Sequence, residues 1–295
     1  MFASMLVNGI ITGAFYALMA LGLTMIFGVL RIVNFAHGEF YMIGGFVYVL
    51  LYHNVGLSIP FALPAAVVVG GLLGWLVDKL LMGPIYTDAR SMRQGRDEYA
   101  IIVTFALSLF LVALMTKLVG PWSLQGPRLA DGRPIAIAGV RVSPHQIIAL
   151  AVTVAFLLAS MLLLNHSLWG RQIRAVAQNR FAAAIVGIDV RRVSMLVFAA
   201  AGALAALAGA MLSNMISPAP DVGAFPAIKS YVIIVLGGLG SPVGAILGGL
   251  LLGIIENLGA FYVSFAYRDT YGLVLLVLVL LLRPNGLFGE IRREV

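Results

Sequence analysis

The first thirty residues, MFASMLVNGIITGAFYALMALGLTMIFGVL (Met1–Leu30), contain no charged side chain. About 20 consecutive apolar residues are enough for a helix to cross the hydrocarbon core of a bilayer. The stretch is too long for the apolar part of a signal peptide, and no basic residues precede its apolar run. We therefore expect a retained first membrane-spanning helix.

The composition extends this interpretation to the whole chain. Of 295 residues, 61% are hydrophobic and only 11% are charged, whereas about a quarter of the residues are charged in soluble domains. Backbone polar groups in hydrocarbon must be satisfied within their own segment. The composition therefore predicts an all-α polytopic membrane protein surrounded by membrane lipid. The chain has no cysteine, which excludes disulfides and thiolate metal sites.

Hydropathy and helix length predict seven clear membrane spans, near 4–30, 58–82, 98–119, 144–165, 191–216, 242–263 and 266–283. Segments 40–54 and 226–240 are shorter or richer in glycine, so we expect eight or nine transmembrane helices in total. Small residues four positions apart predict close helix packing in lipid. These pairs are Gly9 and Gly13, Gly70 and Gly74, Gly244 and Gly248, and Gly249 and Gly253.

The basic residues predict the orientation. Loops on one side hold thirteen of the 19 Lys and Arg residues, and loops on the other side hold six, at positions 117, 128, 133, 141, 229 and 268. Basic residues accumulate in cytoplasmic loops, so we expect the C-terminus inside and, with an odd number of crossings, the N-terminus outside. The net charge of +7 therefore indicates cytoplasmic loops and no nucleic-acid partner. The loop at about 120–143 faces outward, and its runs PIAIA and VRVS, separated by Gly139, predict a small hairpin.

Two apolar segments are interrupted, one in each half of the chain. VLRIVNFAHGEFYMIGG (29–45) breaks its apolar pattern with polar groups, and FPAIKSYVIIVLGGLGSPVGAILGG (225–249) breaks with glycine and Pro242. Such a pair is the best sequence indication of a translocation site, since broken backbone is tolerated at depth only where it is buried in protein or lines water. The candidate translocation residues are Asn34, His37, Gly38, Glu39, Gly237, Gly238, Gly240, Ser241 and the isolated acid Glu256.

Other interpretations of these residues remain open. His37 and Glu39 could be solvated beside Arg31 in an ordinary cytoplasmic turn, and Glu256 could lie at the outer interface. A proton relay through His37 and Glu39 is a further alternative. No second His or acid stands at helical ligand spacing, so we expect no metal site. There is no G-x-x-x-x-G-K-[ST] phosphate loop and no catalytic constellation, so we expect no catalytic residue and no cofactor.

The segment NHSLWGRQIRAVAQNRFAAAIVGIDVRR (165–192) predicts an amphipathic helix over about 170–187. Gly187 can end this helix in a left-handed cap, and Asp189 can cap the next helix. The helix could rest on anionic lipid or lie in the groove of a partner protein. Its compact, alanine-rich stripe favours the partner. The stripe consists of Ile173, Ala177, Phe181, Ile185 and Ile188, and another face carries Arg171, Arg174 and Gln178.

Four motifs occur in one order along the chain: NFAHGEFYMIGG (34–45), GRQIRAVAQNRFAAAIVGID (170–189), VLGGLGSPVGAILGGLLLG (235–253) and LLLRPNGLFG (280–289). Together they resemble the permeases of bacterial branched-chain amino acid ABC importers over nearly the whole chain. The resemblance implies one transmembrane permease domain over 1–295 in the bacterial inner membrane, translocating branched-chain amino acids or a related small polar solute.

The same resemblance implies partners. These are a homologous second permease subunit forming a heterodimer, two cytoplasmic ATPase subunits and an extracytoplasmic substrate-binding protein. The segment at about 166–190 would dock on the ATPase through Arg171, Arg174, Ala177, Phe181, Ala184 and Gly187. Relatives also import urea, short amides and aromatic acids, so the family leaves the substrate open. The rival classes are an ion- or proton-coupled secondary transporter and a passive channel for a small neutral solute, neither of which needs a docking helix.

Overall fold

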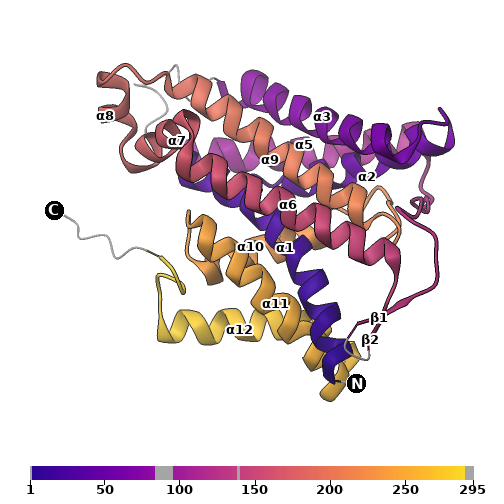
Figure 1. The fold of residues 1–295 in the computed structure, drawn as a ribbon. Coiled ribbons are helices and arrows are strands. Elements are labelled where there is room, and N and C mark those ends of the chain that lie inside the picture. The colour runs from indigo at the N-terminus through magenta and orange to yellow at the C-terminus, as the bar shows by residue number, and fades with distance from the viewer. Residues whose placement is uncertain (1, 84–95, 138–139, 290–295) are drawn as a thin grey trace.

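The computed structural model describes residues 2–83, 96–137 and 140–289. Four of the thirteen basic residues counted for the predicted cytoplasmic side lie outside these ranges, namely Arg90, Arg93, Arg292 and Arg293. Gly139 of the predicted hairpin also lies outside them. Within the described residues, the chain forms a bundle of long apolar helices (Figure 1).

Among the described residues, seven helices are long and apolar enough to cross a membrane, and they coincide with the seven predicted spans. They are α1 (Phe2–Leu30), α3 (Ile59–Val77) with its π-helical extension (Asp78–Met82), α5 (Arg96–Val119), α6 (Pro144–His166), α9 (Val190–Leu212), α11 (Pro242–Tyr262) and α12 (Arg268–Leu282), which follows a 3-10 turn (Phe265–Tyr267). The all-α polytopic fold is therefore confirmed, while the exact number of crossings, eight or nine, stays a prediction.

The two doubtful segments form short helices, α2 (His37–His53) and α10 (Ala224–Gly237), of 17 and 14 residues. α2 begins halfway along α1, since a ring nitrogen of His37 lies 3.0 Å from the carbonyl oxygen of Met19. Residues 31–36 therefore run back along the last turns of α1. α10 begins beside the start of α2, where the backbones of Gly38 and Gly223 touch, and its far end turns at Gly240 beside Gly28 of α1. Both are half-helices that start inside the bundle.

Glycines allow the long helices to cross closely. Gly9 and Gly13 of α1 face Gly253 and Gly249 of α11, and a Cβ on Gly9 would lie 2.8 Å from the Cα of Ile254. Gly70 and Gly74 of α3 meet Gly202 of α9 in the same way. The expected close packing through small residues is confirmed at these pairs.

These two crossings show an internal repeat. α1 packs on α11 and α3 packs on α9, while α2 packs on α3 and α9 just as α10 packs on α11 and α1. The helices α1, α2, α3 and α5 thus correspond, in this order, to α9, α10, α11 and α12. The second set crosses the bundle in the opposite direction. Inverted repeats with discontinuous helices at their interface are a common plan of membrane transporters.

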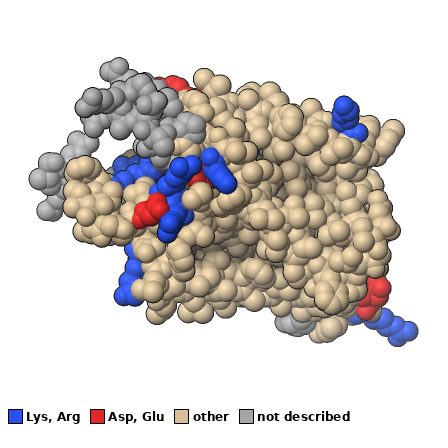
Figure 2. Space-filling model, turned by 90° about the horizontal axis from the view of Figure 1, so that it is seen from above, with Lys and Arg blue, Asp and Glu red and all other residues tan. Residues whose placement is uncertain are grey.

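Peripheral elements distinguish the two ends of the bundle. The predicted hairpin is present as β1 (Ile135–Ile137) and β2 (Val140–Val142), paired antiparallel with Ile135 opposite Val142. It lies at the end of the bundle that carries the N-terminus, and α7 (Leu168–Gln178) and α8 (Arg180–Ile185) lie at the opposite end (Figure 1). On the face shown in Figure 2, Lys and Arg side chains gather mainly at the α7–α8 end, and the area between the two ends is almost free of charge.

The prediction of a single helix over about 170–187 is wrong. Asn179 has an extended backbone (φ −152°), and its side chain accepts a hydrogen bond from the Ala182 backbone N–H, so it caps a new helix, α8. Asparagine is among the preferred N-cap residues. The resulting bend divides the predicted stripe: Ile173 and Ile188 pack against the core, whereas Phe181 and Ile185 project outward, 78% and 70% exposed.

Candidate functional site

The segment between α1 and α2 is held inside the protein by its neighbours. Arg31 adopts a positive φ of 56° and reverses the chain. The Phe35 backbone N–H donates to Thr104 Oγ1 of α5 (3.1 Å), and the Tyr231 hydroxyl of α10 donates to the Asn34 carbonyl oxygen (2.6 Å). The Asn34 side chain also accepts from the Ala36 backbone N–H (3.1 Å). The backbone freed by the helix break is thus satisfied within the protein, as the bilayer requires.

The first residues of α2 connect three other elements. His37 is fully buried against α1, and Glu39, 4% exposed, accepts a hydrogen bond of 2.7 Å from Ser108 Oγ of α5. The second carboxylate oxygen of Glu39 has no hydrogen-bond partner among the described residues and faces Gly223. The alternative in which His37 and Glu39 are solvated beside Arg31 is therefore wrong. Gly38 has no positive φ; its importance lies in the close approach of the Gly223 backbone.

The second interrupted segment lies at the other end of α10. Gly238 and Gly240 have φ of 103° and 83°, values that suit glycine, and Ser241 caps α11 by accepting from the Gly244 backbone N–H (3.1 Å). The last carbonyls of α10 accept hydrogen bonds from the backbone N–H groups of Leu287 and Phe288 (2.9 and 3.0 Å). Asn34–Glu39 and Gly237–Ser241 thus hold opposite ends of α10, and the structure does not bring them together.

Glu256 belongs to a third location. It is fully buried and accepts a hydrogen bond from the Tyr16 hydroxyl (3.1 Å), and it forms an ion pair with Lys229. The alternative that placed Glu256 at the outer interface is therefore wrong. Lys229 was assigned above to an outer loop, which is also wrong, because it lies in α10 and is 3% exposed. The aliphatic part of the Lys229 side chain can pack within an apolar helix. Its two partners lie 27 and 40 positions away in the sequence, so no local sequence pattern predicts these ion pairs.

Sequence reasoning therefore missed Lys229, Tyr16 and Asp269 as members of this network. Lys229 lies 3.2 Å from Asp269 Oδ1 of α12 in addition to its pair with Glu256. One signal was available: a lysine in the apolar run FPAIKSYVIIVL (225–236) is costly unless it is paired. An isolated glutamate in the following helix was its natural partner.

The predicted docking residues lie on α7, α8 and the turn after them. Arg171, Phe181, Ala184 and Gly187 are exposed, and Ala177 is half-buried. Arg174 bonds to the carbonyl oxygens of Leu164 and Asn165, so it fastens α7 to the end of α6.

Both predicted caps of this segment are confirmed. Gly187 has a φ of 86°, and the Ile188 backbone N–H returns to the Ala183 carbonyl (3.0 Å), which ends α8 in a left-handed turn. Asp189 then caps α9 by accepting from the Arg192 backbone N–H (3.1 Å). These caps fix the direction in which the chain leaves α8 and enters α9. The large apolar side chains of α8 remain exposed.

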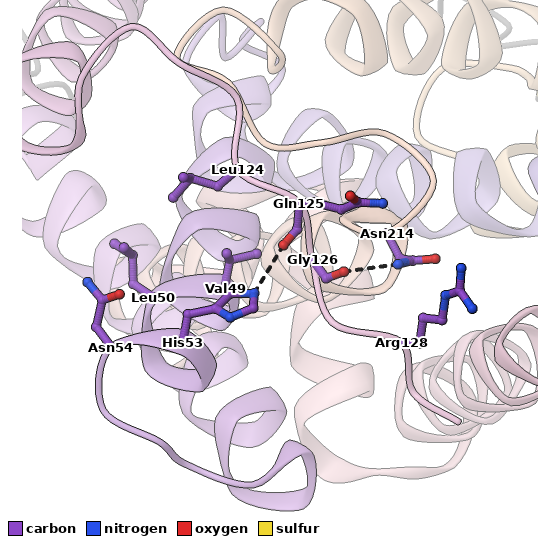
Figure 3. A pocket seen from close by; sticks show the side chains of 9 residues that line it. All are labelled: Val49, Leu50, His53, Asn54, Leu124, Gln125, Gly126, Arg128 and Asn214. Atoms are coloured by element: carbon purple, nitrogen blue, oxygen red, sulfur yellow. Dashed lines mark hydrogen bonds between the residues drawn. The ribbon is translucent and has the colours of Figure 1, made fainter. Parts of the chain in front are cut away.

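A cavity of about 520 Å³ opens at the hairpin end of the molecule. The end of α2, residues 124–128 and the connection between α9 and α10 form its walls (Figure 3). Hydrogen bonds join these walls: a ring nitrogen of His53 to the Gln125 carbonyl (3.2 Å), and Asn214 Nδ2 to the Gly126 carbonyl (2.9 Å). Sequence reasoning did not predict this cavity, since its lining comes from three separate segments that carry no motif.

Two half-helices that meet inside a bundle of apolar helices, within an inverted repeat, define a multi-pass membrane transport protein. The chain belongs to the family described as the permease component of the branched-chain amino acid transport system, whose family model matches residues 5–282. The sequence expectation of a permease is thereby confirmed at the level of the family.

Relatives and a solved structure agree with this assignment. The chain is 33% identical to the high-affinity branched-chain amino acid transport permease LivH of Escherichia coli (98% of this chain, 96% of that protein). It is 34% identical to BraD of Pseudomonas aeruginosa, which has the same description (97% and 95%). A structure of PsaBC from Streptococcus pneumoniae in complex with Fab has a similar fold, with a TM-score of 0.54 over 94% of this chain and 91% of that one, at 13% identity.

Proposed function

We propose that this chain is a permease subunit of an ABC importer that carries branched-chain amino acids across the inner membrane. ATP hydrolysis would take place on separate subunits docked at the α7–α8 end. The observation that carries the proposal is the α7–α8 segment itself, in a chain that resembles LivH and BraD over its whole length. Its apolar side chains Phe181, Ile185 and Val186 are 70–78% exposed beyond the bundle, where a secondary transporter or a channel has no need of them.

The proposed assembly follows from the two ends of the molecule. A homologous second permease subunit would complete the path as a heterodimer, and two ATPases would bind at the basic end. An extracytoplasmic binding protein would deliver the solute at the hairpin end, where the cavity opens. This arrangement places the N-terminus outside and the C-terminus in the cytoplasm.

The translocation path would run along the exposed side of the half-helix junction. Phe35 and Phe105 are 37% and 53% exposed there, and the Phe35 ring also contacts the Tyr231 ring, with centroids 5.7 Å apart. The buried residues Asn34, His37, Gly38 and Glu39 would position one end of α10 beside this path, and Gly237–Ser241 would position the other. Tilting α10 would then switch access between the two sides.

Reconstitution tests the proposal directly. The chain should co-purify with an ATPase subunit, and vesicles containing the complete transporter should accumulate leucine with ATP and without a proton gradient. Leucine uptake that requires a gradient and no ATP would support the secondary transporter instead.

Single cysteines test the orientation, since the chain has none: Ser123→Cys should react with an impermeant thiol reagent in intact cells, and Gln178→Cys should be protected.

A further inference from the structure

Lys229 carries a charge inside the bundle and is surrounded by three groups. Its ammonium pairs with Glu256 of α11, lies 3.2 Å from Asp269 Oδ1 of α12 and stands 5.1 Å from the centroid of the Phe225 ring. The Lys229 side chain is 4% exposed and the Glu256 side chain is completely buried. Glu256 by itself therefore balances the buried ammonium, and the Tyr16 hydroxyl supports Glu256 from α1.

Asp269 differs from its partners because its side chain is 62% exposed. It lies in the first turn of a membrane-spanning segment whose other exposed side chains include Leu273, Val274, Val277 and Leu278. A carboxylate in such a segment is costly against lipid and almost always faces a bundle interior or a water-filled cavity. The side of α12 that carries Asp269 is therefore expected to face water or another subunit.

The surface beside Asp269 is not covered by the described part of the chain. Phe225 and Ile228, both on α10, are 41% and 56% exposed next to the buried lysine. Arg268 interacts electrostatically with Tyr16 and Glu256, so it adds a positive charge on their side of the network. An exposed carboxylate is thus held beside two apolar side chains, on the half-helix that borders the proposed path.

We propose that Asp269 binds the ammonium group of the transported amino acid, and that Lys229 positions the Asp269 carboxylate from behind. The proposal rests on the proposed function, because it names the substrate-contacting residue of that path. Lys229 keeps Glu256 as its partner when Asp269 turns to the substrate, so no buried charge is left unpaired during the exchange. Phe225 and Ile228 offer an apolar surface to the aliphatic side chain of the solute.

The contact between Asp269 and the ammonium group of the solute would be weak, as a translocation path requires. The Asp269 carboxylate is partly hydrated and shared with Lys229, so a passing ammonium gains only part of a charge-assisted hydrogen bond. The solute can therefore leave again, as translocation requires. A solute with a carboxylate and no ammonium would be repelled.

Saturation-transfer NMR on the complete transporter in nanodiscs, without the binding protein, tests the proposal. Three probes separate the charges: leucine, leucinol (an ammonium and no carboxylate) and 4-methylpentanoate (a carboxylate and no ammonium). We compare the wild type with Asp269→Asn, and we use Asp131→Asn in the exposed outer loop as the matched control. Leucine and leucinol should give signals in the wild type and in the control, and both signals should fall about fivefold in Asp269→Asn because a charge-assisted contact is lost.

Two results would overturn the proposal. Unchanged leucine and leucinol signals in Asp269→Asn would show that the carboxylate does not meet the ammonium. An equally strong 4-methylpentanoate signal in the wild type would show that charge is not recognised. The proposed function fails separately, if wild-type vesicles show no ATP-driven leucine uptake. Asp269→Glu restores the charge, so recovery of the leucinol signal in that variant distinguishes substrate contact from a purely structural role.

Discussion

The two half-helices of this protein have the same backbone plan and different surroundings. α2 and α10 each begin inside the bundle, after a segment that returns from the end of a long helix. α2 is enclosed on almost every side, with Gly44 and Gly45 packed on Ala206 and Gly209 of α9. α10 leaves one side open, where Phe225 and Ile228 are exposed. The comparison indicates that α2 is scaffold and that α10 borders the path.

The difference extends to their charged groups. The Glu39 side chain, at the start of α2, accepts a hydrogen bond from Ser108, its one donor among the described residues, and is covered by protein. Lys229 of α10 is held by two carboxylates, one buried and one exposed. Substitutions in α2 should therefore act mainly through folding. Substitutions at the anchors of α10 should affect both stability and transport.

The largest effect is expected at the anchor of α10. Lys229→Met leaves Glu256 buried without its ion pair, and breaking a buried pair from one side lowers the free energy of unfolding by about 3–5 kcal/mol. The double variant Lys229→Met, Glu256→Gln removes both charges and should recover most of that loss. Thermal unfolding of the purified protein measures both. Equal stability of the wild type and Lys229→Met would show that this network does not anchor α10.

A smaller effect is expected where the half-helices touch. A Cβ at Gly38 would meet the Gly223 carbonyl and lie 2.9 Å from the Cβ of Ala227, so Gly38→Ala should destabilise the protein by about 1–3 kcal/mol through overpacking. Gly71→Ala is the control, because its added Cβ would meet only ordinary contacts of 3.5 and 3.6 Å. It should be neutral or stabilising. If both variants unfold at the same temperature, the close approach of α2 and α10 is not needed.

Substitutions in the proposed docking segment, α7 and α8, should lower transport and leave the stability of the protein unchanged. Ala184 is exposed on α8, so Ala184→Glu places a charge in the proposed ATPase groove and should lower ATP-driven uptake about tenfold, as expected when a buried charge finds no partner. Ala182→Glu, also exposed but on the opposite face of the same short helix, should have a weaker effect. Uptake and ATPase co-purification are measured on both. Full uptake by Ala184→Glu would contradict docking through this face.

The sequence predicted the seven long spans, the two interruptions and the caps at Gly187 and Asp189, because each depends on local chemistry. Hydropathy over 20 residues, glycine at positive φ and side-chain caps are all readable within a few positions. The break at Asn179 was missed although the residue type was visible. An asparagine inside an amphipathic pattern is compatible with a continuous helix and with a new cap, and the pattern alone does not choose between them.

The arrangement of the site depends on contacts that are distant in sequence. Lys229 and Glu256 are separated by 27 positions and Tyr16 and Glu256 by 240, so neither pairing has a periodicity that could reveal it. The polar residues at 34–39 were identified correctly as a helix break and were expected to line a lumen. Their burial follows from the packing of α1, α5 and α10 around them, which hydropathy does not specify.

The smallest effect is expected for a substitution of His37. It distinguishes a structural role of this residue from a role in proton transfer. One ring nitrogen of His37 bonds the Met19 carbonyl of α1 (3.0 Å), and the other has no hydrogen-bond partner among the described residues. Glu39, the nearest acid in the sequence, is directed to Ser108 of α5. A proton relay needs exchangeable groups on both sides of the histidine, and none is present among these contacts.

His37→Ala should therefore remove one hydrogen bond and some packing, lowering the free energy of unfolding by about 1–3 kcal/mol. Leucine uptake per inserted molecule, driven by ATP without a proton gradient, should fall by no more than about fivefold, since an effect below about 1 kcal/mol on the transport step changes a rate by less than about fivefold. Abolished uptake in a stable His37→Ala protein would mean that α2 takes part in transport directly, and the distinction between an enclosed scaffold helix and an open path helix would fail.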